Sequence, residues 1–267
     1  MKEFTVREDT TLKTFTDNFY AQASFCFRTL LKAREIRVNG ARVSADMPLK
    51  QGDIVRYFLT PKQESRAAFS VVYEDGNVIV ADKESGVNSE AVFSALCERG
   101  ETYFIHRLDR NTAGLLVFAK NAEAEGELLS AFRDRRVEKI YLARVVGCPK
   151  EKHAVCTAYL KKDAAASRVR VSSKPVGEKI ITEYEVVERG ETSLLRVTLH
   201  TGKTHQIRAH LAFLGFPIVG DEKYGDGAYN RAHNAVRQKL VAKRLTLHCA
   251  GALAYLDGRS FLSSHEV

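Results

Sequence analysis

The segment HRLDRNTAGLLVFAK, at residues 106–120, places three ionisable side chains directly before an apolar run. His106, Arg107 and Asp109 precede a turn of small residues, and Leu115–Ala119 is typical of a buried strand. An aspartate beside two cations at a strand end has two interpretations. It can be a structural ion-pair partner, or a nucleophile or base that a nearby guanidinium keeps ionised. Local context leaves both open.

A second polar segment, HTGKTHQIRAHL at residues 200–211, combines three histidines with a lysine and an arginine. We expect a helix that begins near Thr204 and ends near Gly215. His205 and Arg208 then share one face, and the positive end of the helix dipole adds to their charge. Together they can hold a phosphate or an acid from elsewhere in the chain. Five-residue spacing keeps the histidines off a common face, so we predict no metal site.

Tyr141 stands in EKIYLARVVG, a segment that predicts a strand. A tyrosine on a strand is commonly a core ring with its hydroxyl at the edge of the core. It can also stack on a nucleobase, because every base has a π face.

The elements that position these residues fall into two parts. The polar segment Leu59–Phe69 contains a proline and separates two patterned regions, so we predict a small part at 1–60 and a large one at 61–267. In the small part, a helix around Phe25–Ala33 precedes two short strands. Asn39-Gly40 joins these strands, which is the strongest short signal for a hairpin.

The large part contains more expected strands than helices. A hairpin turns within Glu74–Asn77, and a helix runs to Gly100 with Ser89 as its N-cap. Further strands are expected at 115–119, 139–147, 179–202 in two runs, and 244–256, with helices at 122–137 and 204–215. Most neighbouring strands are expected to pair antiparallel. The predicted fold class is α+β, with a mixed, mainly antiparallel sheet rather than a doubly wound one.

Basic residues exceed acidic residues by 41 to 33, which gives a formal net charge of +8. The surplus favours an anionic partner such as nucleic acid or an acidic membrane surface, although it also suits a merely basic soluble protein. Cations crowd one N-terminal segment, opposed only by Glu35: Arg28, Lys32, Arg34, Arg37 and Arg42. They can form one phosphate-facing surface or a solvated charged face.

The five cysteines form no C-x-x-C pair, which argues against a disulfide framework and favours a reducing cytoplasm. The N-terminal residues MKEFTVREDT lack the apolar region of a signal peptide. The apolar runs fall far short of the roughly 20 residues that cross a bilayer. We therefore expect a cytoplasmic protein without a membrane segment and, by default, a monomer.

Four segments together resemble the RluA-type pseudouridine synthases: HRLDRNTAGLLVFAK, EKIYLARVVG, TGKTHQIRAHLAFLGFPIVGDEKYG and LTLHCAGAL. Their order and approximate spacing match, over nearly all of residues 70–257. The segment LLKAREIRVNGARVSADMPLKQGDIVRYF resembles the small RNA-binding module first seen on a small-subunit ribosomal protein, which commonly precedes this catalytic domain. Three positions depart from the family pattern: Ala113 for serine, Lys203 for arginine, and Glu84 for the proline of K-P-x-G. The last removes a proline from the local turn.

The resemblance implies that the protein isomerises uridine to pseudouridine within RNA. No cofactor is implied, because the reaction involves neither a redox change nor group transfer to water. Asp109 is implied as the essential acid, which attacks the sugar or takes a sugar proton. Arg208 is implied as its ion-pair partner. Tyr141 is implied as the ring that stacks on the uracil and helps to remove the proton from carbon 5.

A uridine inside a stacked helix cannot be reached, so the resemblance also implies base flipping. Arg107 matches the family position that fills the vacated stack. We expect His106, Lys203 and His205 to lie near RNA or to support the site. The arginines of the N-terminal segment are expected to contact the RNA backbone: Arg34, Arg37 and Arg42.

Ribosomal RNA of the large subunit is the expected substrate, because enzymes of this family that carry the module often act there. Transfer RNA is the alternative substrate. A non-catalytic RNA-binding protein, such as a ribosome-assembly factor, would need the basic module but not the set of Asp109, Tyr141 and Arg208. An enzyme for another anionic substrate, such as a phosphosugar, would not need the module.

Overall fold

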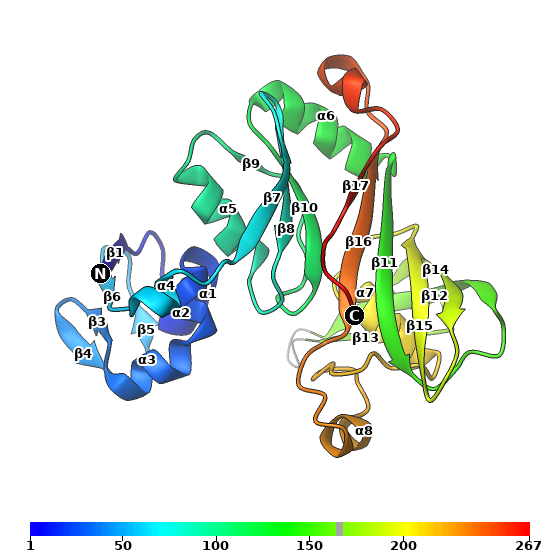
Figure 1. Cartoon of the computed structure of the whole chain (residues 1–267), viewed down its shortest axis with the longest axis horizontal. Helices are drawn as coiled ribbons and strands as arrows, with labels where there is room; N and C mark the ends of the chain where they lie inside the picture. The colour runs from blue at the N-terminus through cyan, green and yellow to red at the C-terminus, as the bar shows by residue number, and fades with distance from the viewer. Residues whose placement is uncertain (164–167) are drawn as a thin grey trace.

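The computed structural model describes residues 1–163 and 168–267. The N-terminal part has a four-stranded antiparallel sheet in the order β1 (Lys2–Thr5), β6 (Ile54–Tyr57), β3 (Ile36–Val38) and β4 (Ala41–Val43). Its helices are α1 (Leu12–Phe19), α2 (Ala21–Phe25) and α3 (Phe27–Ala33), and β2 (Thr10–Thr11) pairs with β5 (Pro48–Leu49). The N-terminal part lies beside one end of the larger part (Figure 1).

The hairpin predicted at Asn39-Gly40 is confirmed, since β3 and β4 pair across it. Both turn residues have positive φ, 50° and 84°, as a type I′ turn requires. The Asn39 side chain also binds the neighbouring strand, because its Oδ1 accepts a hydrogen bond from the Ile54 amide at 2.9 Å. Helices and sheet enclose their own apolar core, which includes Leu12, Leu30 and Val55.

The larger part is built on an eleven-stranded sheet. Nine strands follow in the order β13 (Arg168–Ser172), β12 (His153–Asp163), β14 (Glu178–Glu188), β15 (Thr192–Leu199), β11 (Val137–Val146), β16 (Leu240–Leu247), β10 (Ala113–Ala119), β8 (Val78–Lys83) and β7 (Phe69–Glu74). β17 (Arg259–Leu262) pairs with β16, and β9 (Tyr103–Phe104) pairs with β10. The described pairs are antiparallel apart from β10 and β16, which run parallel. The α+β class with a mixed, mainly antiparallel sheet is therefore confirmed.

β10 is buried on both of its faces, which explains the apolar run that follows Asp109. Leu116 and Phe118 point to the core on the side of α5 (Ser89–Cys97). Leu115 and Val117 point to the opposite core, under α6 (Ala122–Arg133). Since neighbouring residues of a strand face opposite sides, only an uninterrupted apolar run fills both cores.

Gly114 is required where β10 meets β16. Its φ is 114°, and a Cβ at this position would lie 2.4 Å from the carbonyl oxygen of Ala242. Any other residue would therefore push the two strands apart. This close approach brings the chain around Leu240 next to the turn that contains Asp109.

The remaining helices are α4 (Pro61–Glu64), which packs against α2, α7 (Gln206–Phe213), α8 (Gly227–Ala232) and the 3₁₀ helix η1 (Gly251–Leu256). The expected strand at 244–256 was therefore wrong in its second half. The expected N-cap was also wrong, because Asn88 occupies that position and Ser89 is the first helical residue. Among the described residues, the structure has no helix of the length and apolarity that crossing a membrane would need.

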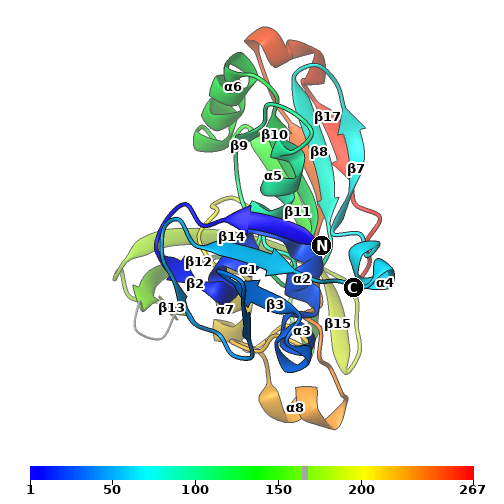
Figure 2. The ribbon, with the colours of Figure 1, turned by 90° about the vertical axis from the view of Figure 1, so that its left-hand side faces the viewer.

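The N-terminal part docks on the larger one through its helices, as Figure 2 shows from the side of the N-terminus. α1 packs against α5, and Ala21 joins the core of the larger part. The Asn88 amide donates to Asn18 Oδ1 at 2.9 Å, and the Ser94 hydroxyl donates to the Asn18 carbonyl at 3.2 Å. The helix that precedes the Asp109 segment is thereby tied to the N-terminal part.

Candidate active site

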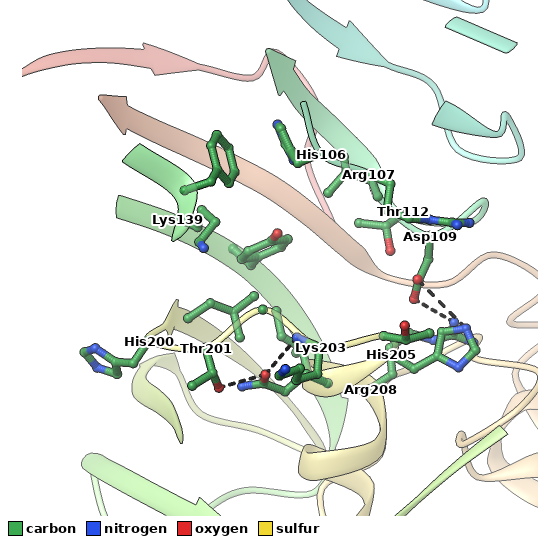
Figure 3. A pocket seen from close by; sticks show the side chains of 18 of the residues that line it. His106, Arg107, Asp109, Thr112, Lys139, His200, Thr201, Lys203, His205 and Arg208 are labelled. Atoms are coloured by element: carbon green, nitrogen blue, oxygen red, sulfur yellow. Dashed lines mark hydrogen bonds and ion pairs between the residues drawn. The ribbon is translucent and has the colours of Figure 1, made fainter. Parts of the chain in front are cut away.

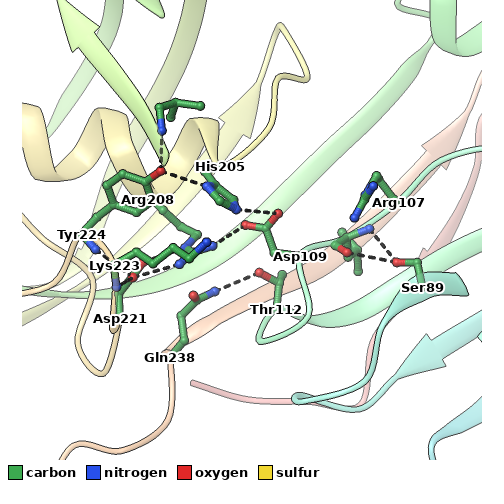
Figure 4. A network of polar contacts seen from close by, with 12 residues as sticks. Ser89, Arg107, Asp109, Thr112, His205, Arg208, Asp221, Lys223, Tyr224 and Gln238 are labelled. Carbon is green, nitrogen blue, oxygen red and sulfur yellow. Dashed lines mark hydrogen bonds and ion pairs between the residues drawn. The ribbon is translucent and has the colours of Figure 1, made fainter. Parts of the chain in front are cut away.

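Asp109 lies in a turn that neighbouring residues hold in place (Figure 4). Its carbonyl accepts a hydrogen bond from the Thr112 amide at 3.0 Å. The Ser89 hydroxyl donates to the Leu108 carbonyl at 3.0 Å and accepts from the Leu108 amide at 2.9 Å. On the other side, the Gln238 amide donates to the buried Thr112 hydroxyl at 2.9 Å. These contacts fix the backbone on both sides of the carboxylate.

Lys83 supports the same turn from below, and the sequence reasoning missed it. Its fully buried ammonium donates to the carbonyls of Val87 at 2.8 Å, Glu84 at 3.0 Å and Arg110 at 3.2 Å. Burial lowers the pKa of Lys83 to about 7, against the opposing effect of the Asp109 charge. Glu84, which replaces the usual proline, uses its amide in a 2.9 Å hydrogen bond to the Ala68 carbonyl. The turn is therefore ordered without the proline.

Arg208 reaches Asp109 from 99 positions later in the chain, with Nη1 2.8 Å from Oδ2. Its other edge binds both oxygens of Asp221, with Nε 2.7 Å from Oδ2 and Nη2 2.9 Å from Oδ1. The Arg208 side chain is 7% exposed and that of Asp221 is fully buried. Although burial opposes it, the two carboxylates raise the pKa of Arg208, so the guanidinium stays charged.

Asp221 was not singled out from the sequence, although it lies in the DEKYG stretch of the resemblance. Besides Arg208, it accepts hydrogen bonds from the backbone amides of Lys223 at 2.8 Å and Tyr224 at 3.0 Å. Burial would raise the pKa of Asp221, but these bonds and the Arg208 charge lower it. The buried carboxylate therefore stays ionised and holds Arg208 in one orientation.

One oxygen of Asp109 stays open to the cleft. Within the described part of the chain, no hydrogen bond to Oδ1 is formed, and His205 Nε2 lies 3.9 Å from it. The Asp109 side chain is 22% exposed. Arg208 thus orients the carboxylate through Oδ2 and leaves Oδ1 free for a ligand.

His205 was expected within the helix, but in the structure it precedes the helix and caps it. It is the N-cap of α7 with a left-handed φ of 54°. Its Nδ1 lies 2.9 Å from the Tyr224 hydroxyl, which in turn accepts from the Val169 amide at 2.8 Å. The Tyr224 proton therefore points to Nδ1, which favours the tautomer with a proton on Nε2, towards Asp109. Burial lowers the pKa of His205 against the effect of Asp109, so the ring is neutral near pH 7.

Tyr141 is presented by a β-bulge, since the pairing of β11 with β16 shifts between Ile140 and Tyr141. Bulges of this kind re-aim side chains next to active sites. The ring is 8% exposed, and its hydroxyl has no hydrogen-bond partner among the residues that the structure describes. Burial, and then the charge of Asp109, raise the pKa of Tyr141. The phenol therefore stays protonated at neutral pH.

A cleft of about 820 Å³ brings most of the predicted residues together (Figure 3). Seven of them line it: His106, Arg107, Asp109, Tyr141, Lys203, His205 and Arg208. The other three belong to the N-terminal part and do not line it: Arg34, Arg37 and Arg42. No group of three or more histidine, cysteine or acidic side chains suited to a metal ion occurs in residues 1–163 and 168–267.

The seven residues differ in their freedom to bind a ligand. Arg107 is 69% exposed and lies 3.4 Å from Glu90. Lys203 is paired with Glu178 at 2.8 Å. His106 Nε2 accepts a hydrogen bond from the Val117 amide at 3.1 Å, and burial lowers its pKa to about 3, with help from Lys139. His106 is therefore a neutral ring whose Nε2 is already used by the protein.

The chain is similar to known RNA-modifying proteins. The family described as RNA pseudouridylate synthase matches residues 77–213. The chain is 34% identical to the ribosomal large subunit pseudouridine synthase C of Vibrio parahaemolyticus over 253 residues, which are 85% of this chain and 78% of that protein. It is 34% identical to the ribosomal large subunit pseudouridine synthase D of Borreliella burgdorferi over 190 residues, which are 62% of this chain and 58% of that protein. The solved structure of human RNA pseudouridylate synthase domain containing 1 superposes with a TM-score of 0.59 at 25% identity, over 74% of this chain and 90% of that one.

Proposed function

Because the chain belongs to the RNA pseudouridylate synthase family and is therefore an RNA pseudouridine synthase, we propose that it isomerises uridines of ribosomal RNA. The relatives named as ribosomal large subunit pseudouridine synthases support ribosomal RNA over transfer RNA. We also expect the protein to work as a cytoplasmic monomer without a cofactor.

The observation that carries the proposed site is the contact between Arg208 and Asp109. An ion pair of 2.8 Å joins two motifs that lie 99 positions apart, and it does so at the wall of a cleft. The bidentate hold of Asp221 on Arg208 leaves one guanidinium edge for Asp109. A carboxylate that is ionised, oriented and open on one oxygen is the group that chemistry at a ribose carbon requires.

The reaction needs one bond to break and another to form at the same sugar carbon. The bond from uracil nitrogen 1 to the sugar breaks, the base turns, and carbon 5 bonds to the sugar instead. Carbon 5 then loses its proton and nitrogen 1 gains one, so the uracil keeps its composition. We assign the sugar step to Oδ1 of Asp109, which either attacks the sugar carbon or removes a sugar proton.

We assign Tyr141 to the uracil. Its ring lies in the same cleft as Asp109, and its hydroxyl has no partner within the described part of the chain, so it is free to bind the base. Burial, and then the Asp109 charge, raise the pKa of Tyr141, so the phenol is protonated at neutral pH. Stacking uses the neutral phenol. For the phenol oxygen to accept the carbon 5 proton, its own proton must pass to nitrogen 1, the atom that gains a proton in the reaction.

The remaining assignments concern RNA binding. Arg107 is the most exposed of the predicted residues in the cleft, which suits a side chain that fills the stack left by a flipped base. Residues 1–60 are proposed to form the RNA-binding module. Its three predicted arginines are Arg34, Arg37 and Arg42, and none has an acid partner within the described residues. The Arg37 guanidinium lies over the Phe58 ring, 4.9 Å from its centre.

Tritium release from RNA labelled at carbon 5 of uridine tests the proposal. Wild-type protein should release tritium from an unmodified transcript of large-subunit ribosomal RNA. Asp109→Asn should release none while its binding of the same RNA stays nearly unchanged. Release from transfer RNA alone would overturn the substrate, and release by Asp109→Asn would overturn the role of Asp109.

A further inference from the structure

The charges of the cleft do not balance among its own residues. Two acids line it, and both are already paired: Asp109 with Arg208 at 2.8 Å and Glu178 with Lys203 at 2.8 Å. Three other cations of the lining have no acid partner among the residues that the structure describes: Arg135, Lys139 and Lys179. Lys179 and Arg135 are exposed and Lys139 is half-buried, and Arg135 and Lys139 lie close to Tyr141 in the chain.

Of Arg135 and Lys139, Lys139 is the less expected to lack an acid partner, because its side chain is partly buried. It lies on β11 two residues before Tyr141, across the β-bulge, and both side chains line the cleft. Its ammonium forms neither a hydrogen bond nor an ion pair within the described residues, and it lies 5.6 Å from the Phe132 ring. Burial, and then the charge of Arg135, lower the pKa of Lys139. A partly buried ammonium without a counter-ion destabilises the folded protein. An unpaired charge of this kind in a cleft therefore indicates a site where an anionic ligand binds.

The Lys139 side chain points towards the loop that follows β15. Its Nζ lies 3.8 Å from the place that a Cβ on Gly202 would occupy. Gly202 has no side chain, so the space in front of the ammonium stays open to a ligand. Lys203, which follows Gly202, points its own charge to Glu178 instead.

Arg135 is also held in an unusual way. It follows α6 with a left-handed φ of 59°, at a position that glycine commonly takes. A non-glycine residue in this conformation costs about 1 kcal/mol. Its neighbours in the sequence are engaged, since Arg133 binds Asp134 at 3.2 Å and Arg136 binds Glu127 at 3.1 Å. Arg135 alone among these arginines is left for a ligand in the described structure.

We propose that Lys139 and Arg135 form a binding site for one backbone phosphate of the RNA, next to the flipped uridine on the Tyr141 side of the cleft. The proposal rests on the proposed function, because the anion belongs to the RNA substrate. A phosphate offers the charge that both cations lack, and it accepts several hydrogen bonds at once. Binding it would place the uracil over Tyr141 and the ribose at Asp109.

The test measures RNA binding by the full chain as a function of potassium chloride, with Asp109→Asn present throughout so that the RNA stays unmodified. The probe is the unmodified transcript of large-subunit ribosomal RNA. Lys139→Gln and Arg135→Gln should each weaken binding by about tenfold at low salt. Each should also reduce the steepness of log K against log salt by about 0.7 to 0.9, as expected for one lost phosphate contact.

Arg133→Gln is the matched control, because Arg133 lines the same cleft but is paired with Asp134. It should leave the slope nearly unchanged. Lys139→Arg should keep most of the slope, because it restores the charge. If Lys139→Gln and Arg133→Gln have equal slopes, the phosphate site is overturned.

Thermal melting and tritium release separate this proposal from its alternatives. Lys139→Gln should keep or raise Tm, because it removes a partly buried charge without a partner; a lower Tm with an unchanged slope would mean a structural role and overturn the site. If wild-type protein releases no tritium from any RNA while the slopes fall as expected, the phosphate site stands and the proposed function fails. If tritium is released but the slopes do not fall, the proposed function stands and the phosphate site fails.

Discussion

The guanidinium of Arg110, the residue next to Asp109, lies 2.7 Å from the carboxylate of Asp17 in α1. Asp17 is 9% exposed and also accepts hydrogen bonds from Lys13 and, at 2.5 Å, from the Ser24 hydroxyl. Arg110 binds the Gly86 carbonyl at 3.1 Å through Nε. The N-terminal part is thus joined directly to the turn that carries the proposed catalytic carboxylate.

Asp17→Asn should therefore lower kcat although it lies outside the cleft. Losing the charge frees Arg110, and small shifts of a reacting group cost about tenfold to a hundredfold in rate. We expect a fall of that order in tritium release, with RNA binding retained. Lys2→Gln is the control, because Lys2 forms an exposed ion pair with Glu98 across the same junction at 3.0 Å. Equal kcat values for the two variants would exclude a positioning role for Asp17.

Asp221→Asn should remove activity and destabilise the fold. Breaking a buried ion pair costs about 3–5 kcal/mol, because the remaining guanidinium stays buried without its partner. Thermal melts should show a large fall in Tm, together with loss of tritium release. Glu188→Gln is the control, since Glu188 pairs with Arg144 at 2.9 Å but is 56% exposed, and exposed pairs contribute about 0–1 kcal/mol.

Arg208→Lys separates the orientation of Asp109 from its charge balance. A lysine keeps the positive charge but cannot bind Asp221 through two donors and Asp109 through a third in one plane. We expect a folded protein with at least a tenfold lower kcat and a nearly unchanged KM for RNA. Wild-type kcat in this variant would show that only the charge at this position matters.

Replacing Arg34, Arg37 and Arg42 together by glutamine should weaken RNA binding and reduce the steepness of its salt dependence by about 2 to 3. The reason is that these side chains have no acid partner among the described residues. The matched control replaces Lys50 and Arg56 in the same part, which are paired with Asp9 and Glu3. An unchanged slope in the triple variant would mean that this surface does not touch the RNA backbone.

His210 should make the fold sensitive to acid. Its ring is fully buried, Nδ1 lies 3.0 Å from the Thr182 hydroxyl, and Nε2 has no partner in the described residues. Burial lowers the pKa of His210 to about 4, from 6.5. Between these values the unfolded chain binds a proton that the folded protein does not, so stability falls as the pH falls from about 6.5 to 4. Over this range, His210→Gln should flatten the dependence of the unfolding free energy on pH, while exposed His153→Gln should not.

Local sequence patterns predicted much of the fold. Asn39-Gly40 predicts its hairpin because positive φ values are cheap for these two residues, and Leu115–Ala119 predicts a buried strand because both of its faces are apolar. The errors arose where a distant partner decided the outcome. Ser89 reads as an N-cap, but its hydroxyl is taken by Leu108, and Gly251–Leu256 reads as a strand but forms a 3₁₀ helix.

Residue types in a recognisable order were enough to predict the family, the reaction and the candidate site residues. Which charges meet depends on the folded chain. Asp221 holds Arg208, Arg208 orients Asp109, and Lys139 is left without a partner, through contacts between segments that the chain order does not bring together. Pairing and burial depend on distances in three dimensions, and these distances set whether a charge is satisfied or free to bind a substrate.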